Sequence, residues 1–459
     1  MNNYKDFLTS KEIVDYDSGF RVSKNKLNPM LFDFQKSIVQ WCLKRGRSAI
    51  FAGCGLGKTP MQLEWAKHVN TKTKKPVLIL APLAVSKQTK REGEKFGINV
   101  NVCKSKANVI NGINITNYEK LHNFDASVFS GIVLDESSIL KNFTGKIKKE
   151  IIKQFKNTKY KLACTATPSP NDHMELGNHS EFLDIMPSNQ MLSNWFILDT
   201  MLLGKYRLKK HAVNYFWQWV ASWACCLELP SDLGFDDGGF ILPDVKYKKH
   251  VVKSPYQEPI QGQLMYVPKL SATNIHKELR NSNENRVNKA LEIVNEDPDK
   301  SWIIWCNTNY ESNLLRKTFP PNWIEVKGSD SDKSKEENLL KFTFEDDQKI
   351  ITKPSIAGFG LNWQHCYNVI FVGLSYSYEM FYQAVRRSWR FGQEHNVNVH
   401  LIQSENDKNI SDTLTRKQIS HNTMQNAMKD VNFMSVTGKE SKIKVYQIGK
   451  KTTKLPEFT

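Results

Sequence analysis

A glycine-rich run near the start of the chain constrains the fold more than any other feature. The run is Ala52-Gly-Cys-Gly-Leu-Gly57-Lys58-Thr59; the apolar segment 48–52 precedes it and the helix-compatible segment 61–66 follows it. A strand, a tight turn and a helix in this order present backbone N–H groups, a lysine and a hydroxyl to phosphates and magnesium. Alanine stands at the first glycine position of the general pattern, where a small residue can suffice. The run predicts a phosphate-binding turn at the end of a strand.

Short apolar runs alternate with polar, helix-compatible stretches in two parts of the chain, 28–170 and 285–403. This alternation is typical of parallel sheets covered by helices. It predicts an α/β protein with two parallel-sheet domains and a mixed insertion between them. The expected divisions are an N-terminal extension 1–29, a first domain 30–170, an insertion or linker 171–284, a second domain 285–405 and a C-terminal extension 406–459.

The charge balance favours a polyanionic partner. Lysine and arginine number 64 against 47 acidic residues, a formal net charge of +17, and each phosphate contact on a nucleic acid releases counterions. Solubility alone is the competing explanation for the same excess.

No run of about 18 apolar residues and no signal peptide is evident, so we expect a soluble intracellular protein that does not bind membranes. The eight cysteines lack zinc-like spacing, so neither a zinc site nor structural disulfides are expected.

An acidic pair ends an apolar run in the first domain. Asp135 and Glu136 follow Ile132-Val-Leu134, and open parallel sheets build their ligand sites at the carboxyl ends of their strands. An isolated acidic pair of this kind is usually a solvated turn. With the glycine-rich run upstream, we expect Asp135 to complete a magnesium shell that includes Thr59, and Glu136 to activate the attacking water.

A second basic motif lies in the last fifth of the chain. It is the run Gln383-Ala-Val-Arg-Arg387-Ser-Trp-Arg390-Phe-Gly-Gln393. Arginines carried by a second domain can stabilise the charge that develops in phosphoryl transfer. We therefore expect Gln383, Arg387 and Arg390 to be catalytic. An amphipathic basic surface helix is the alternative for this run.

The insertion combines aromatic and basic residues. Tyr215, Trp219 and Trp223 recur at a four-residue spacing, and Lys209 and Lys210 precede them. Such groups could stack bases and hold phosphates; a helix that buries one aromatic face is the favoured alternative. Beyond Gln403 the chain is polar, and its lysine-rich end is compatible with either a lone edge strand or a loose tail.

Taken together, the motifs resemble those of superfamily-two helicases, most closely the Swi/Snf-type branch of double-stranded DNA translocases. The resemblance covers nearly the whole chain, in the family's order. The matching segments are 32–35, 52–59, 78–82, 115–118, 134–142, 165–168, 355–362 and 383–393. The most discriminating is the last, with its Gln-Ala, Arg, Arg and Gly-Gln spacing. It implies two RecA-like domains, with ATP and Mg²⁺ as cofactors.

The resemblance also implies residue roles. Gln35 would read adenine, and Thr165 and Thr167 would couple the ATP state to the grip on a strand. The implied ATP site comprises Gln35, Gly53, Cys54, Gly55, Leu56, Gly57, Lys58, Thr59 and Gly360. Nucleic-acid contacts are expected at Thr116, Asn117, Tyr118, Lys209, Lys210, Thr352 and Lys353.

Two departures limit what carries over from the family. Ser138 stands where the branch usually has histidine, so hydrogen bonding around the acidic motif is expected to differ. The chain is also too short for histone-reading domains, and its compact layout resembles helicase-like proteins of bacteriophages and prophages.

Double-stranded DNA is the expected partner. An RNA or single-strand helicase and an ATP-gated nucleic-acid clamp that does not move processively are the alternatives.

Overall fold

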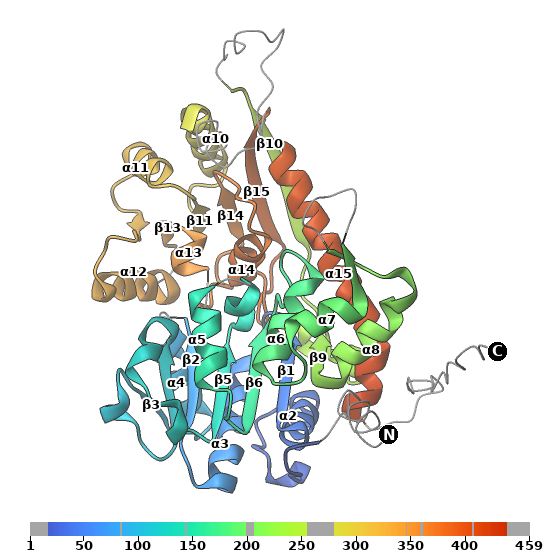
Figure 1. Cartoon of the computed structure of the whole chain (residues 1–459). Helices are drawn as coiled ribbons and strands as arrows, with labels where there is room; N and C mark the ends of the chain where they lie inside the picture. The colour runs from blue at the N-terminus through green and yellow to red at the C-terminus, as the bar shows by residue number, and fades with distance from the viewer. Residues whose placement is uncertain are drawn as a thin grey trace, which may run out of the picture.

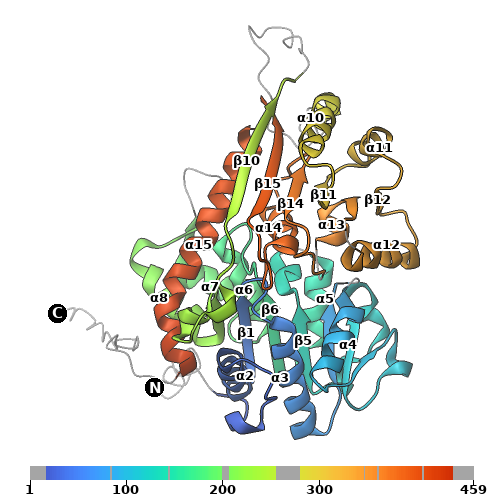
Figure 2. The same ribbon diagram turned by 180° about the vertical axis from the view of Figure 1, so that it is seen from behind.

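The computed structural model describes residues 17–82, 85–142, 145–198, 206–254, 280–345, 347–358, 361–405 and 408–437. Within these residues the chain forms two parallel sheets, each covered by helices on both faces, and a small antiparallel hairpin (Figures 1 and 2). The expected α/β fold with two parallel-sheet domains is confirmed. The lysine-rich end after residue 437 and the expected ATP-site residue Gly360 lie outside the described residues.

The first sheet has seven strands in the order β3-β4-β2-β5-β6-β1-β9, and every neighbouring pair is parallel. Its strands are β1 (Arg47–Ala52), β2 (Val77–Ala81), β3 (Val100–Val102), β4 (Ile113–Asn117), β5 (Gly131–Asp135), β6 (Tyr160–Thr165) and β9 (Ala224–Leu227). Strand β5 lies two places from β1, so the acidic pair and the glycine-rich turn meet at the same edge of the sheet.

Helices cover both faces of this sheet with separate apolar cores. One face packs against α2 (Asp33–Arg45), α3 (Lys58–Thr73) and α4 (Ser86–Lys95). The other packs against α5 (Lys146–Gln154), α6 (Leu176–Phe182), α7 (Ser188–Trp195) and α8 (Val213–Trp223). Strand residues that alternate between the two cores give β1 and β5 apolar side chains on both faces, as buried parallel strands require.

The second sheet has six parallel strands in the order β10-β15-β14-β11-β13-β12. These are β10 (Val245–Val252), β11 (Trp302–Trp305), β12 (Ile324–Glu325), β13 (Lys349–Thr352), β14 (Asn368–Phe371) and β15 (Val397–Ser404). Helices α10 (Asn283–Glu296) and α11 (Asn309–Thr318) pack on one face. Helices α12 (Asp332–Phe344), α13 (Pro354–Ala357) and α14 (Tyr378–Ser388) pack on the other.

The segment expected as an insertion contributes to both sheets. Strand β9 extends the first sheet beside β1, and β10 forms an edge of the second beside β15. All four residues of β9 are apolar and buried, so joining the sheet satisfies both their backbone groups and their apolar side chains. The remainder of the segment carries α7, α8 and the hairpin of β7 (Phe196–Leu198) with β8 (Tyr206–Leu208). The expected domain boundaries stay predictions.

A long helix, α15 (Lys408–Thr437), follows the second sheet and returns to the first domain (Figures 1 and 2). Ile410 and Leu414 belong to the core of the second domain, whereas Met424 and Met428 belong to the core of the first. The Lys417 ammonium donates to the Asn171 side-chain oxygen at 2.8 Å and to the Tyr376 carbonyl at 2.7 Å. The helix therefore connects the two domains through apolar packing and hydrogen bonds. No helix in the described part of the chain is long and apolar enough to cross a membrane.

Shortening a buried methionine of α15 should destabilise the first domain. Met424 is completely buried, so Met424→Ala removes apolar contacts and leaves a cavity that costs about 2–5 kcal/mol. Ile419→Ala on the same helix is the matched control, because Ile419 is 61% exposed and its loss should change stability by at most about 0.5 kcal/mol. Urea unfolding followed by tryptophan fluorescence measures both; equal effects would show that α15 does not pack on the first domain.

Candidate nucleotide site between the two domains

The glycine-rich turn has the backbone geometry of a phosphate cradle. It joins β1 to α3, and Gly55 and Gly57 have positive φ angles of +96° and +76°. These angles favour glycine because a Cβ at a positive φ is crowded by the adjacent carbonyl oxygen of the local backbone. The first N–H groups of a helix have no partner within the helix, so the 16-residue α3 presents donors at the turn.

The Gln35 side chain is hydrogen-bonded to the glycine-rich turn. Its side-chain nitrogen donates to the Leu56 carbonyl at 3.0 Å, and its side-chain oxygen accepts from the Phe32 backbone N–H at 3.0 Å. A Cβ at Gly57 would lie 2.3 Å from that nitrogen. The amide that was expected to read adenine is thus buried and bonded to the phosphate-binding turn itself.

Lys58 is folded onto the same turn. Its ammonium donates to the carbonyls of Ala52 at 2.8 Å and Gly53 at 3.3 Å. A lysine ammonium has three donors and no acceptor, so it can exchange these carbonyls for phosphate oxygens. The lysine that was expected to bind phosphate therefore lies against the glycine-rich turn.

The acidic pair ends β5 at the expected edge of the sheet. One Asp135 carboxylate oxygen accepts from the Gln62 side chain of α3 at 2.8 Å, and the Asp135 carbonyl accepts from the Tyr118 hydroxyl at 2.8 Å. Glu136 adopts a left-handed backbone conformation with φ +62°. This is uncommon for a non-glycine residue and turns the chain sharply after the strand.

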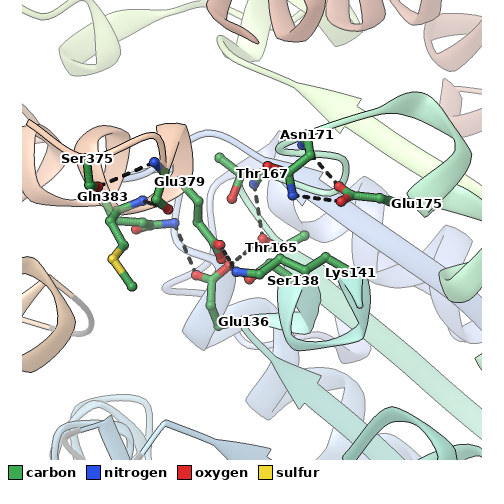
Figure 3. Close-up of polar contacts among 12 residues, drawn as sticks. Glu136, Ser138, Lys141, Thr165, Thr167, Asn171, Glu175, Ser375, Glu379 and Gln383 are labelled. Carbon is green, nitrogen blue, oxygen red and sulfur yellow. Dashed lines mark hydrogen bonds and ion pairs between the residues drawn. The ribbon is translucent and has the colours of Figure 1, made fainter. Parts of the chain in front are cut away.

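The Glu136 carboxylate is the centre of a hydrogen-bond network that crosses the domain boundary (Figure 3). From the first domain it accepts from the hydroxyls of Thr165 and of Ser138, the latter at 3.1 Å. From the second domain it accepts from the Gln383 side-chain nitrogen at 3.2 Å. The Thr167 backbone N–H donates to the Thr165 hydroxyl at 3.0 Å. The two expected coupling residues are therefore linked to the acidic motif.

Burial and neighbouring charges shift the pKa values of the acidic pair. Burial raises the pKa of Glu136 to about 7; the neighbouring Glu379 carboxylate adds to the rise, and Lys58 opposes it. Burial also raises the pKa of Asp135. A carboxylate whose pKa lies near neutral pH is well matched to accepting a proton from water.

The arginine run lies against the phosphate cradle. A Cβ at Gly55 would lie 2.9 Å from the Phe391 backbone nitrogen, and the Cys54 thiol is 3.6 Å from the Gln383 side-chain oxygen. Two sequence segments more than 300 residues apart thus meet at one site. Glycine at position 55 permits this close approach between the domains.

The two expected finger arginines are held inside the second domain. Arg387 donates to the Gln383 carbonyl at 3.1 Å and to the Leu361 carbonyl at 2.8 Å, while Arg390 donates to the same Leu361 carbonyl at 3.0 Å. Burial lowers the pKa of Arg387, and burial together with the Arg387 charge lowers the pKa of Arg390 to about 10. Arg390 therefore remains charged at neutral pH.

The sequence analysis missed three contributors to the site. Lys141 of the first domain pairs with the buried Glu379 of α14 across the domain boundary (Figure 3). Phe32, Phe240 and Phe391 form an aromatic cluster with ring centroids 4.8–6.5 Å apart. Glu228 contacts the cradle after β9. Lys141 belongs to a motif that was noted; the other contacts depend on pairings between distant segments that no local pattern encodes.

The expected nucleic-acid contacts have mixed positions. Thr116, Asn117, Tyr118 and Thr352 are all buried, which leaves them little surface for a ligand. The Lys353 ammonium donates to the Asn309 side-chain oxygen at 2.5 Å, and the Lys209 ammonium donates to the carbonyls of Ser193 and Asn194 at 2.9 Å. Lys210 is exposed.

The aromatic helix of the former insertion is mostly a packing element. Trp219 and Trp223 of α8 are buried in the core of the first domain. Tyr215 is 44% exposed. The observed burial agrees with the favoured alternative, a helix that buries an aromatic face against a sheet.

The residues at this edge fit ATP with Mg²⁺. Thr59 and Asp135 offer a hydroxyl and a carboxylate, which are oxygen donors of the kind that Mg²⁺ prefers. The Gln35 side chain fills the space that a Cβ at Gly57 would occupy, so the turn keeps a bare backbone at this position. When bound, ATP and Mg²⁺ supply the scissile phosphate bond and the cation that neutralises phosphate charge.

Comparisons with known proteins identify two domain families in the sequence. The SNF2-related domain matches residues 34–210, and the helicase conserved C-terminal domain matches residues 284–392. Among solved structures, the chain is similar to a Sulfolobus solfataricus SWI2/SNF2 ATPase core in complex with dsDNA. The two are 18% identical, with a TM-score of 0.43, and the match covers 91% of this chain and 97% of that one. Comparison with curated protein sequences gave no significant match.

Substituting Gly57 should damage ATP binding through a steric clash. Gly57→Ala places a methyl group 2.3 Å from the Gln35 side chain at a positive φ, so we expect ATP affinity to fall about tenfold or more, equivalent to about 1.4 kcal/mol. Gly97→Ala is the control, because Gly97 also has a positive φ but would meet nothing within 4 Å. Calorimetric ATP titration compares them. Wild-type affinity in a folded Gly57→Ala protein would contradict the assigned cradle.

Proposed function

We propose that this chain is a Swi/Snf-type, ATP-dependent translocase acting on double-stranded DNA, on the basis of its matches to an SNF2-related domain and a helicase conserved C-terminal domain. Its two domains would close on ATP, hydrolyse it, and move along one strand of the duplex as they reopen. The proposed location is the cytoplasm, which would be that of the host if the protein is encoded by a phage.

The hydrogen bond between Gln383 and Glu136 is the observation that carries this proposal. It joins residues 247 positions apart and links the arginine-bearing helix of one domain to the acidic motif of the other. A nucleoside-triphosphatase that depends on domain closure needs such a connection, because groups from both domains must act on one phosphate. The site is incomplete in either domain alone.

The residues divide the chemical work as follows. Lys58 would exchange its carbonyl partners for the terminal phosphates, and Thr59 and Asp135 would hold Mg²⁺. Glu136 would orient the attacking water and accept its proton. Arg387 and Arg390 would leave the Leu361 carbonyl, to which both are hydrogen-bonded, and stabilise transition-state charge. Ser138 takes part through its hydrogen bond to Glu136.

The high net positive charge supports a nucleic acid as the partner of this ATPase. A formal charge of +17 favours association with a polyanion and should make that association salt-dependent. Charge does not distinguish DNA from RNA, whereas the family branch favours duplex DNA. Hydrogen-bond donors on the protein would contact phosphates of the duplex without reading its sequence.

The choice of nucleic acid is tested by stimulation of ATP hydrolysis. We expect duplex DNA to accelerate turnover more than single-stranded DNA or RNA, because only a duplex translocase is activated by closure on two strands. Displacement of a third strand from a triplex in the presence of ATP would then demonstrate movement. Stimulation by RNA alone would instead support an RNA helicase, and duplex stimulation without triplex displacement would support a clamp.

Removing Arg390 should reduce turnover much more than ATP affinity. A finger arginine stabilises mainly the transition state, so Arg390→Ala should lower kcat by about 10³-fold or more and abolish nucleic-acid stimulation. Arg416→Ala on α15 is the control, since Arg416 is exposed and lies outside the proposed site. Steady-state ATPase kinetics with and without duplex DNA measures the effect. A folded Arg390→Ala protein with its stimulated rate intact would refute the finger assignment.

A further inference from the structure

Glu228 occupies a position beside the phosphate cradle that no recognised motif accounts for. It directly follows β9, whose last residue, Leu227, pairs with Ala52 at the end of β1. The Gly53 N–H donates to the Leu227 carbonyl at 2.9 Å, and a Cβ at Gly53 would lie 2.8 Å from the Glu228 carboxylate. The carboxylate is therefore packed against the first residue of the turn.

A tight turn fixes the backbone at Glu228. The Asp232 carboxylate accepts from the backbone N–H groups of Glu228 at 2.8 Å and of Leu229 at 3.1 Å. Asp232 also pairs with Lys429 of α15 at 3.1 Å. Side-chain acceptors that bind successive backbone donors hold such turns in one conformation. The backbone of Glu228 is consequently held in one position by Asp232.

The Glu228 carboxylate forms an ion pair across the domain boundary. One oxygen accepts from the Arg386 guanidinium of α14 at 3.1 Å. That guanidinium stacks 4.1 Å from the Trp389 ring centroid and 5.2 Å from that of Tyr382. Arg386 is 7% exposed, so its charge is largely removed from water, and a buried charge without a partner is strongly unfavourable.

The other Glu228 oxygen is bound by α15. It accepts from the Gln425 side-chain nitrogen, and His421 lies 3.9 Å away. Gln425 and His421 also hydrogen-bond each other at 3.0 Å. One carboxylate thus contacts the phosphate cradle, the arginine helix and the helix that connects the domains.

Among the described residues, the three arginines of the run differ in what they bind. Arg387 and Arg390 hydrogen-bond only to groups of the second domain. Arg386, immediately before Arg387, is the one that pairs with a carboxylate of the first domain. Among the arginines of the run, Arg386 is therefore the one that ties the run to the first domain, beside the contacts made by Gln383 and Glu379.

We propose that Glu228 and Arg386 are positioning residues that set the distance between the phosphate cradle and the arginines at 387 and 390. The proposal rests on the ATPase function proposed above. In this proposal both residues act through the position of α14 and not on the phosphates. Because α14 is a continuous helix through Ser388, holding Arg386 against Glu228 also places the adjoining Arg387.

Neutralising Glu228 should lower the turnover rate while leaving ATP binding nearly unchanged. Glu228→Gln keeps the size of the side chain but leaves the Arg386 charge buried without its counter-ion, which disfavours the docked position of α14. We expect kcat to fall about tenfold or more, while KM for ATP changes less than about threefold, because Lys58 and the cradle are intact. Arg386→Gln should give the same split, and the double variant should be little worse than either single variant, because both remove one interaction.

The matched control is a second ion pair between the domains. Lys87 of α4 pairs with Glu336 of α12, and the two side chains are 67% and 33% exposed. Exposed pairs contribute little, so Glu336→Gln should leave kcat and KM unchanged. Small-angle X-ray scattering without nucleotide gives a readout independent of activity. Glu228→Gln should increase the radius of gyration, and Glu336→Gln should not.

The possible outcomes separate this proposal from the proposed function. Absence of ATPase activity in the wild-type protein would refute the function itself. Given an active wild type, an unchanged kcat in folded Glu228→Gln would overturn the positioning role. A loss that appears mainly in KM would also overturn it, by assigning Glu228 to support of the cradle alone. If thermal unfolding shows that neither Glu228→Gln nor Arg386→Gln folds, the pair serves fold stability and the proposal fails.

Discussion

The site depends on one carboxylate that both domains share. Glu136 accepts hydrogen bonds from Thr165 and Ser138 of its own domain and from Gln383 of the other. It is partly buried, and burial raises its pKa to about 7. A carboxylate removed from water needs several donors to remain ionised. The second domain acts on this carboxylate in two opposite ways, because the Gln383 donor stabilises its ionised form while the Glu379 carboxylate raises its pKa.

Small and charged residues line the boundary between the two domains. Gly55 lets the Phe391 backbone approach the phosphate cradle, and Gly53 leaves room for the Glu228 carboxylate. Lys141 with Glu379 and Glu228 with Arg386 form charged pairs across the same boundary. Pairs of this kind stabilise one relative position of two surfaces more than they stabilise either surface. Helix α15 adds apolar contacts in both cores.

The motif with serine in place of histidine illustrates how a departure from a family pattern is accommodated. Ser138 has a short side chain, and its hydroxyl donates to the Glu136 carboxylate at 3.1 Å. Gln383 of the second domain contacts the same carboxylate directly. The difference in hydrogen bonding that was expected from this serine stays a prediction.

The sequence by itself determined the α/β class, the turn after β1, the acidic pair after β5 and the arginine run, because each depends on local periodicity or on residue types within a few positions. It did not reveal that β9 belongs to the first sheet and β10 to the second. Nor did it reveal that Gln35 is hydrogen-bonded to the glycine-rich turn, or that Arg386 is the arginine paired across the boundary. These features were decided by tertiary structure. A four-residue apolar strand or a buried arginine acquires its partner only when segments some hundreds of residues apart pack together, and no local pattern specifies which segments will meet.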